Sequence, residues 1–299
     1  MIENSFFLDL IKNPQSISKL KFDNISRILK TVKKIFEKEN LLLELNVNNK
    51  TDLVYVIGDI HGNLETLIEL IKIIDKNNPA IVIFLGDIVD RGPMQLECLV
   101  IIFALKILFP SKYYLIRGNH ETLEINQIYG FFQDFLLRFK DQSKFIEIIE
   151  VYNTLPLCVL LNKTILCLHG GIPQDPEILS KLKGQKCKDF GEVFTYNAQS
   201  IYQIMWNDPK SELQGFSDSF RGSGIKFFGN DAFEAFMKHN KLNCLIRAHE
   251  CFPEGYRWFF NKRLLSIFSS TNYRGDYSPN PASYAIIKDN TIIPKLLKI

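Results

Sequence analysis

The sequence predicts an α/β fold of the α+β kind, in which a central sandwich of mixed β-sheets is flanked by helices. Short apolar runs without polar alternation, each stopped by a glycine or a polar group, are typical of strands buried on both faces. In the first half of the chain these runs alternate with helical patterns, whereas in the second half they follow one another as hairpins. We therefore expect a parallel beginning, antiparallel additions, and helices outside.

Three apolar runs, at residues 52–57, 81–85 and 113–116, are the first predicted strands. Residues 64–75 have apolar side chains at helical spacing, and the longest apolar stretch, residues 99–109, is expected to be a buried helix behind the sheet. The intervals from Asp59 to Asp87 and from Asp87 to Asn119, which follow these strands, each fit a strand, helix, strand unit of about 30 residues. Such crossovers bring the residues after each strand to one edge of the sheet, where open α/β folds bind ligands.

Further strands are expected in the second half of the chain. A two-residue turn, Asn162-Lys163, separates the first two of them, and polar turns at 261–262 and 289–290 separate later pairs. These strands are expected at residues 158–161, 164–168, 243–246, 257–260, 264–269, 283–288 and 291–296.

The first 50 residues differ from the rest in pattern. Residues 25–39 carry apolar side chains at helical spacing with lysines opposite, which indicates an amphipathic helix. Such a helix can bind a partner or a membrane, but we favour packing on its own domain. We expect residues 1–50 to be an N-terminal helical segment packed on one compact domain, residues 51–299.

Composition excludes several function classes. Lys plus Arg number 36 and Asp plus Glu 33, so the near-neutral balance argues against a dedicated nucleic-acid binder. No apolar stretch reaches the roughly 20 residues of a membrane span, and neither a membrane location nor a secretory leader is expected. The six cysteines show no CxxC pairing and are expected to be reduced, which favours the cytoplasm, or also the nucleus if the source is eukaryotic.

Five short segments carry most of the functional information: GDIHG, GDIVDRG, RGNHE, LHGG and RAHE. Each follows a predicted strand, so their polar side chains are expected to converge. Four of the five histidines fall inside them, whereas His239 is expected at an exposed helix end. A single aspartate after a strand is usually a turn former, but the combination favours a site for two metal ions. The predicted ligands are Asp59, His61, Asp87, Asn119, His169 and His249.

The ligand types predict the chemistry. Carboxylate, imidazole and amide ligands without cysteine suit manganese, iron or zinc. Asp87 is expected to bridge the two ions because a carboxylate has two oxygens to share. Two divalent ions can activate a water and clamp the oxygens of an in-line displacement. Since Asp59 and Asp87 are the only acidic ligands, the site stays net positive and should prefer an anionic substrate.

Flanking residues point to phosphate as that anion. The planar fork of Arg91 can hold two phosphate oxygens. His120, beside the ligand Asn119, is expected to give a proton to the departing alkoxide, and Asp90 to hydrogen-bond the His120 imidazole.

The five segments, in this order along the chain, resemble those of the phosphoprotein phosphatase family, the metal-dependent serine/threonine phosphatases within the calcineurin-like metallophosphoesterases. The first three segments are shared with small-molecule hydrolases of the superfamily, so the second half discriminates. Residues 122–131 are similar to the family after its GNHE segment, and so are Trp206-Asn207-Asp208-Pro209, Arg221-Gly222 and the loop of residues 269–273. The resemblance covers roughly residues 25 to 296.

The resemblance implies a calcineurin-like metallophosphoesterase architecture, with residues 51–299 as the catalytic domain. It implies that Asp59, His61 and Asp87 bind one ion, and that Asp87, Asn119, His169 and His249 bind the other. It also implies that Arg91, Asn119, His120 and Arg221 contact the phosphoryl group and that Tyr273 reaches the site from an overhanging loop. In that loop Arg274 stands where many relatives have cysteine, and the prolines at 279 and 281 are expected to stiffen residues 276–282.

Three functions follow. The favoured one is a protein serine/threonine phosphatase that hydrolyses phosphoserine and phosphothreonine monoesters by direct attack of a water activated by two metal ions. Mn²⁺ is expected in vitro, with iron and zinc as native alternatives, and phosphorylated proteins and regulatory subunits are the expected partners. The second is a small-molecule enzyme such as a dinucleoside polyphosphate hydrolase. The third is an inactive scaffold, against which the full ligand set argues.

Overall fold

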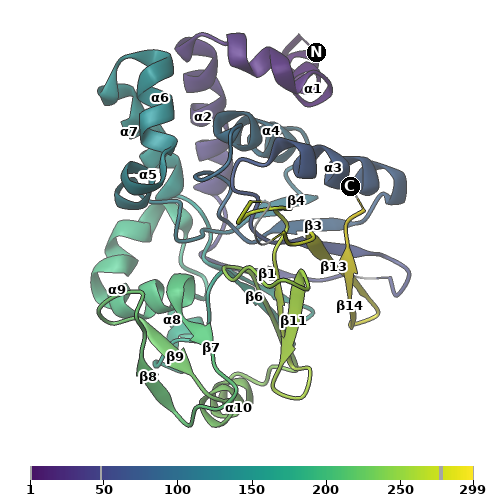
Figure 1. The fold of residues 1–299 in the computed structure, drawn as a ribbon, viewed down its shortest axis with the longest axis vertical. Helices are drawn as coiled ribbons and strands as arrows, with labels where there is room; N and C mark the ends of the chain where they lie inside the picture. The colour runs from purple at the N-terminus through teal and green to yellow at the C-terminus, as the bar shows by residue number, and fades with distance from the viewer. Residues whose placement is uncertain (1, 48, 276–278, 299) are drawn as a thin grey trace.

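Two β-sheets pack face to face in the centre of the molecule, and helices cover them from outside (Figure 1). The computed structural model describes residues 2–47, 49–275 and 279–298. This is the predicted α/β arrangement of mixed sheets flanked by helices.

The five-stranded sheet has the order β14-β13-β2-β3-β4. Its parallel half is β2, β3 and β4, and β13 pairs antiparallel with both β2 and β14. The parallel beginning and the antiparallel addition both match the sequence prediction. The strands are β2 Val54–Ile57, β3 Ile81–Phe84, β4 Tyr113–Leu115, β13 Ser283–Lys288 and β14 Thr291–Leu296.

The six-stranded sheet has the order β1-β5-β6-β10-β12-β11. One turn prediction was wrong: Leu161 pairs with Ile165, so the connection between β5 and β6 spans residues 162–164 and not two residues. The strands are β1 Leu42–Leu45, β5 Cys158–Leu161, β6 Ile165–Leu168, β10 Cys244–Arg247, β11 Tyr256–Phe259 and β12 Leu264–Ile267.

Alternate side chains of each strand enter different cores, because successive residues of a strand point to opposite faces. In β2, Val54 and Val56 pack between the two sheets against Cys167 and Ile246. Tyr55 and Ile57 face the helices instead. The uninterrupted apolar runs of the sequence therefore serve two cores at once.

The helices cover the outer faces. α4 is buried almost throughout, as expected for the longest apolar stretch, and α1 and α2 pack against it. The division into residues 1–50 and 51–299 stays a prediction. None of the described helices is long and apolar enough to cross a membrane. The α-helices are α1 Ile2–Lys12, α2 Phe22–Phe36, α3 Leu64–Asn77, α4 Gln95–Leu108, α5 Leu123–Tyr129, α6 Phe131–Phe139, α7 Ile146–Tyr152, α8 Ile178–Leu182, α9 Phe190–Trp206 and α10 Asn230–His239.

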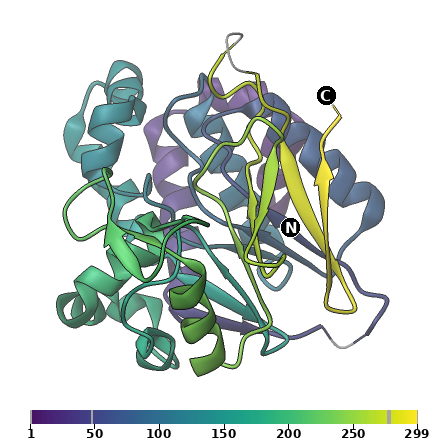
Figure 2. The same ribbon diagram turned by 60° about the horizontal axis from the view of Figure 1, so that its bottom comes forward.

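A small three-stranded sheet was not predicted from the sequence. It consists of β7 Asp208–Pro209, β8 Phe216–Asp218 and β9 Lys226–Phe228. In Figure 2 it lies on the green side of the molecule, away from the yellow β13–β14 hairpin. Strands of two or three residues leave too little periodicity to recognise. This sheet matters for function because Asp208 opens it and Arg221 lies in the loop between β8 and β9.

Candidate metal centre

Residues that follow strands of both sheets meet at one edge of the sandwich. Asp59, Asp87 and Asn119 follow the parallel strands β2, β3 and β4, while His169 and His249 follow β6 and β10 of the facing sheet. All five side chains are buried. The convergence predicted from the strand ends is therefore found, with ligands supplied from both sheets.

Several of these residues have backbones that non-glycine residues rarely adopt. The φ angle is 46° at His61, 52° at Asp87 and 71° at His249. Asp90 and Arg91 are also left-handed, at 66° and 73°. Such conformations persist only where the surroundings hold them, and they cluster at functional sites. Here the carbonyl of Asp87 accepts hydrogen bonds from the amides of Ile60 and His61, which ties the first two motif loops together.

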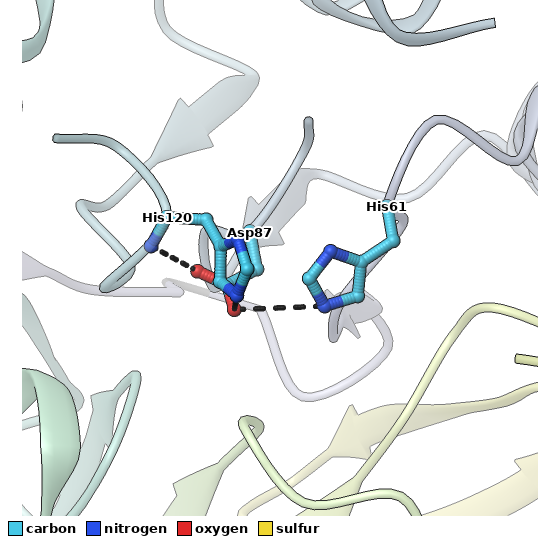
Figure 3. Close-up of side chains that lie close together, drawn as sticks. All are labelled: His61, Asp87 and His120. Carbon is cyan, nitrogen blue, oxygen red and sulfur yellow. Dashed lines mark hydrogen bonds and ion pairs between the residues drawn. The ribbon is translucent and has the colours of Figure 1, made fainter. Parts of the chain in front are cut away.

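The Asp87 carboxylate lies at the centre of the site. Its Oδ2 is 3.7 Å from Nε2 of His61 and 3.9 Å from Nε2 of His120. The same oxygen is 3.4 Å from Nε2 of His169, and Oδ1 accepts a hydrogen bond from the His120 amide at 2.9 Å. Figure 3 shows His61 and His120 directed at this carboxylate from different loops. Asp87 thus has the position that a bridging ligand requires.

Two groups of side chains offer ligand atoms close enough together to hold an ion. One is His61, Asp87 and His120, and the other is Asp87, His169 and His249. They share Asp87, as the predicted pair of sites does.

The remaining predicted ligands border these groups. Oδ2 of Asp59 is 3.5 Å from Nε2 of His61. Oδ1 of Asn119 is 2.8 Å from Nε2 of His169, and Nδ1 of His249 is 3.2 Å from that same nitrogen. The structure thus brings all six sequence-predicted ligands together.

Backbone carbonyls orient two of the imidazoles. Nδ1 of His61 lies 2.9 Å from the carbonyl oxygen of Val89, and Nδ1 of His169 lies 2.8 Å from that of Leu85. A carbonyl can only accept, so Nδ1 carries a hydrogen and Nε2 is the ring nitrogen that faces the cluster. This arrangement is usual for histidines that bind metals.

Two buried polar atoms of the cluster lack partners. Oδ2 of Asp59 and Nε2 of His249 have no hydrogen bond within the described part of the chain. Buried polar atoms are rarely left unpaired, because desolvation without a partner costs free energy. Atoms of these types beside a shared carboxylate suit divalent cations. The residues present therefore fit two such ions.

Charges within the cluster shift its pKa values. Burial alone would raise the pKa of Asp87, but His169, His120 and His61 outweigh it and hold that pKa far below its usual range. Burial would lower the pKa of His169, yet the Asp87 carboxylate raises it to about 9. The pKa of His249 is well below normal because of burial and the neighbouring Arg221. Because a metal ion binds neutral imidazole, an ion at this site would compete with the proton that the Asp87 carboxylate favours on His169.

His120 and Asp90 make the hydrogen bond that the sequence interpretation expected. Nδ1 of His120 is 2.7 Å from Oδ2 of Asp90. The same carboxylate accepts from Nδ2 of Asn126 at 2.8 Å and, through Oδ1, from the amide of Phe131 at 3.0 Å. Asp90 is thus fixed from three directions. With Nδ1 engaged, Nε2 of His120 remains available to a substrate.

The two arginines predicted to bind phosphate are held by different means. The guanidinium carbon of Arg91 lies 3.7 Å from the centre of the Tyr129 ring. Nε of Arg221 donates to Oδ2 of Asp208 at 2.5 Å. Tyr273 stacks on the His61 ring with centroids 4.8 Å apart, so its loop does overhang the site. Residues 276–278 of the segment expected to be stiffened by prolines lie outside the described residues.

Three buried residues of the site were missed by sequence reasoning. Glu121 accepts hydrogen bonds from the amides of Asp87, Ile88 and Gly118, at 2.8, 3.0 and 2.9 Å. Nη2 of Arg247 donates to Oδ1 of Asp208 at 2.9 Å. Glu121 and Arg247 belong to the RGNHE and RAHE segments, so their place in the motifs was a usable signal. Glu121 contacts backbone amides, and Arg247 and Asp208 contact each other, so their residue types alone do not indicate these roles.

Comparisons with known proteins agree with this geometry. Residues 53–253 match the family described as Calcineurin-like phosphoesterase. A catalytic subunit of protein phosphatase 2A from Dictyostelium discoideum is 34% identical over 245 residues, which are 81% of this chain and 77% of the relative.

Solved structures give the same picture. A protein serine/threonine phosphatase from Saccharomyces cerevisiae has a TM-score of 0.83 and 26% identity, covering 99% of this chain and 96% of its own. A cold-active protein-tyrosine phosphatase from a Shewanella species has a TM-score of 0.61 at 16% identity, covering 89% and 84% of the two chains, which is a likeness of fold alone.

Proposed function

Because the chain belongs to the calcineurin-like phosphoesterase family, we propose that it is a protein serine/threonine phosphatase that hydrolyses phosphoserine and phosphothreonine monoesters. The observation that carries this proposal is the 34% identity to a protein phosphatase 2A catalytic subunit over 81% of the chain. The positions of Asp90 and His120, side by side at the metal centre, support it. The dinucleoside polyphosphate alternative has no comparable support.

The metal centre would be filled by two divalent ions. Asp59, His61 and Asp87 would hold the first, and Asp87, Asn119, His169 and His249 the second. When bound, such ions lower the pKa of a water molecule and offset the charge of phosphate oxygens. Mn²⁺ suits the nitrogen and oxygen ligands, with iron and zinc as native candidates.

The side chains around the centre would position the phosphoryl group. Arg91 is stacked on Tyr129 and Arg221 is held by Asp208, so each guanidinium loses little freedom when it binds phosphate oxygens. Tyr273 closes the site from above. Together they would bind a phosphorylated residue and keep it in place for attack.

His120 would act as the general acid. The Nδ1 of its imidazole is hydrogen-bonded to Asp90, which leaves Nε2 to donate a proton to the serine or threonine alkoxide as the ester bond breaks. A positioned proton donor is worth about 10²- to 10⁴-fold in rate. Serine and threonine alkoxides are poor leaving groups, so this step matters most for the proposed substrates.

The test is hydrolysis of three substrates by metal-stripped protein, with and without added Mn²⁺. We expect Mn²⁺-dependent turnover of a phosphothreonine peptide that exceeds turnover of a phosphotyrosine peptide and of diadenosine tetraphosphate. Faster cleavage of diadenosine tetraphosphate would favour the small-molecule alternative. Turnover without metal would contradict the mechanism.

Regulation and location are further parts of this proposal. Regulatory subunits would supply substrate choice, because the residues assigned to substrate binding would contact the phosphoryl group and not the rest of the substrate. All six cysteines are free thiols, and five are buried. Free cysteines are typical of reducing compartments, which supports the cytoplasm or nucleus.

A further inference from the structure

A cavity of about 400 Å³, outside the metal centre, is lined by residues of α5, α7 and α9. These three helices lie on the left of Figure 1. This volume is within the range of small-molecule sites in proteins, about 300–1,000 Å³. Its walls are mostly apolar, with Ile149 from α7 and with Phe194 and Met205 from α9. Neither the metal ligands nor the phosphate-binding residues line it.

Arg117 gives this cavity a buried positive charge. The side chain lines the cavity and only 6% of the residue is exposed. Its guanidinium makes one hydrogen bond within the described chain, from Nε to the carbonyl of Glu121 at 3.2 Å, and Nη1 is buried with no partner. Its flat face rests on the Phe190 ring, 4.7 Å from the centroid.

An arginine in this state has unused binding capacity. An arginine side chain keeps its positive charge in proteins, so the buried guanidinium is a cation. The carboxylates of Glu121 and Glu124 stabilise this charge, but neither of them lies within ion-pair distance of Arg117. Buried charges are normally paired, because an unpaired one bears an uncompensated desolvation cost. A bound anion would recover part of that cost.

The other charge in the cavity limits which anion fits. Glu124 is the second charged residue of the lining among the described residues, and it is exposed at the surface. Its carboxylate disfavours a second negative charge near the entrance. A ligand with one negative group and an apolar body is therefore favoured over a phosphate dianion.

We propose that this cavity binds a monocarboxylate with an apolar body of about the size of an aromatic ring. The carboxylate would accept hydrogen bonds from the guanidinium of Arg117, and the body would pack on Phe194 and Met205. Such a group can belong to a free organic acid or to the C-terminus of a peptide that ends in an apolar residue. Both share the chemistry that Arg117 recognises.

The cavity adjoins two loops of the metal centre. Arg117 directly precedes the Gly118-Asn119-His120 segment. The backbone of Met205 packs so closely on Gly170, next to His169, that an added Cβ there would lie 2.5 Å from it. A ligand in the cavity is thus expected to change kcat, whereas a ligand at the metal centre would compete with substrate and raise KM.

Calorimetry with the Mn²⁺-loaded full chain tests the recognition. We expect 3-phenylpropanoate to bind at least about tenfold more tightly than 3-phenylpropan-1-ol, because a charge-assisted pair with arginine is lost in the alcohol. Equal affinities of the acid and the alcohol, or no detectable binding of the acid at about 10 mM, would overturn the proposal.

A blocking variant locates the ligand. Gly191 lines the cavity, and a Cβ built on it meets no atom within 4 Å, so Gly191→Leu can extend into free space. Glu192→Leu places the same side chain one residue later, outside the lining. We expect Gly191→Leu to weaken binding at least tenfold and Glu192→Leu to leave it within twofold. Unchanged binding in Gly191→Leu would place the ligand elsewhere and overturn the proposal. Replacing Arg117 itself is less informative because Asn119 is two residues away.

Two further experiments are needed. The first asks whether a peptide C-terminus can be the ligand, and the second distinguishes the cavity from the metal centre. A tetrapeptide with a free C-terminal phenylalanine is compared with its C-terminal amide, and binding of the amide as tightly as the acid would contradict carboxylate recognition.

With p-nitrophenyl phosphate as substrate, we expect 3-phenylpropanoate to alter kcat at constant KM. An increase in KM alone would place it at the metal centre and overturn the proposal. Binding is measured without turnover, so it stands or fails separately from the phosphatase function.

Discussion

Nε of Arg221 donates a hydrogen bond to Oδ2 of Asp208 at 2.5 Å, while Oδ1 of the same carboxylate accepts from Arg247 at 2.9 Å. Asp208 therefore connects a partly exposed arginine to a fully buried one. We expect Asp208→Asn to lower kcat/KM for a phosphothreonine peptide by about 10²-fold, mainly through KM, because a displaced arginine no longer orients the phosphate. Steady-state kinetics check this.

The control for this variant is Asp218→Asn. Asp218 also pairs with a cation, Lys226 at 2.5 Å, but its side chain is 86% exposed. Exposed pairs contribute about 0–1 kcal/mol, so we expect kcat/KM to stay within twofold. Asp208→Glu should restore part of the KM if positioning is the role. Equal losses in Asp208→Asn and Asp218→Asn would contradict that role.

A second prediction concerns the leaving group. His120→Asn should lower turnover of a phosphoserine peptide by about 10²- to 10⁴-fold, since the alkoxide then departs without a proton. Turnover of p-nitrophenyl phosphate, whose leaving group needs no proton, should fall much less. Asp90→Asn should show the same dependence on leaving group more weakly, because Asp90 acts through His120. Metal content measured by atomic absorption must stay at two ions for the comparison to hold, and a uniform loss on both substrates would rule out the acid role.

The metal centre was predictable from the sequence because its chemistry is local. Strand ends, glycines and ligand types coincide within segments of four to seven residues, and parallel strands make the convergence of Asp59, Asp87 and Asn119 a geometric necessity. Close approach fixes the glycines as well: at Gly118 an added Cβ would lie 2.3 Å from Oδ1 of Asp87. The strand ends, the glycines and the ligand types can therefore each be recognised from residues that are neighbours in the sequence.

The parts that were missed depend on distant partners. Glu121 supports Asp87 through amides of another motif, and Asp208 pairs with Arg221 and Arg247 from separate elements. The strands of the small sheet are too short to show periodicity, and helix α1 gains its place by packing on α4. Tertiary contacts decide these features, and for Glu121 and Arg247 the only local signal is their place in the RGNHE and RAHE segments.

A third prediction follows from the unpaired atoms of the metal centre. Ions that bind the folded chain stabilise it, by about 2.7 kcal/mol at a concentration of 100 times Kd. We expect Mn²⁺ to raise the Tm of metal-stripped protein and a chelator to reverse the increase. Asp59→Asn should reduce the Mn²⁺-dependent rise, whereas Asp75→Asn, on the distant end of α3, should not. An equal rise in Asp59→Asn would remove Asp59 from the ligand set.

The fourth prediction concerns a buried ion pair far from the site. Nζ of Lys106 is 2.5 Å from Oε1 of Glu39, and their side chains are 1% and 14% exposed. Removing one member leaves an unpaired buried charge, which costs about 3–5 kcal/mol, whereas an apolar replacement of both is often neutral or stabilising. We expect Glu39→Gln to lower the free energy of unfolding and Glu39→Leu combined with Lys106→Met to restore or exceed the original value. Urea unfolding measures both.

The same pair sets a dependence on pH. Burial raises the pKa of Glu39 above its ordinary 4.5 and lowers the pKa of Lys106 below its ordinary 10.5. Between 4.5 and the raised value the folded chain binds the extra proton, so the contribution of Glu39 to stability falls as pH rises. Between the lowered value and 10.5 the unfolded chain binds the extra proton, so the contribution of Lys106 rises with pH. Relative to the double variant, the wild-type chain should therefore be least stable between these windows, near neutral pH. A constant difference in unfolding free energy from pH 5 to 10 would show that burial does not shift either group.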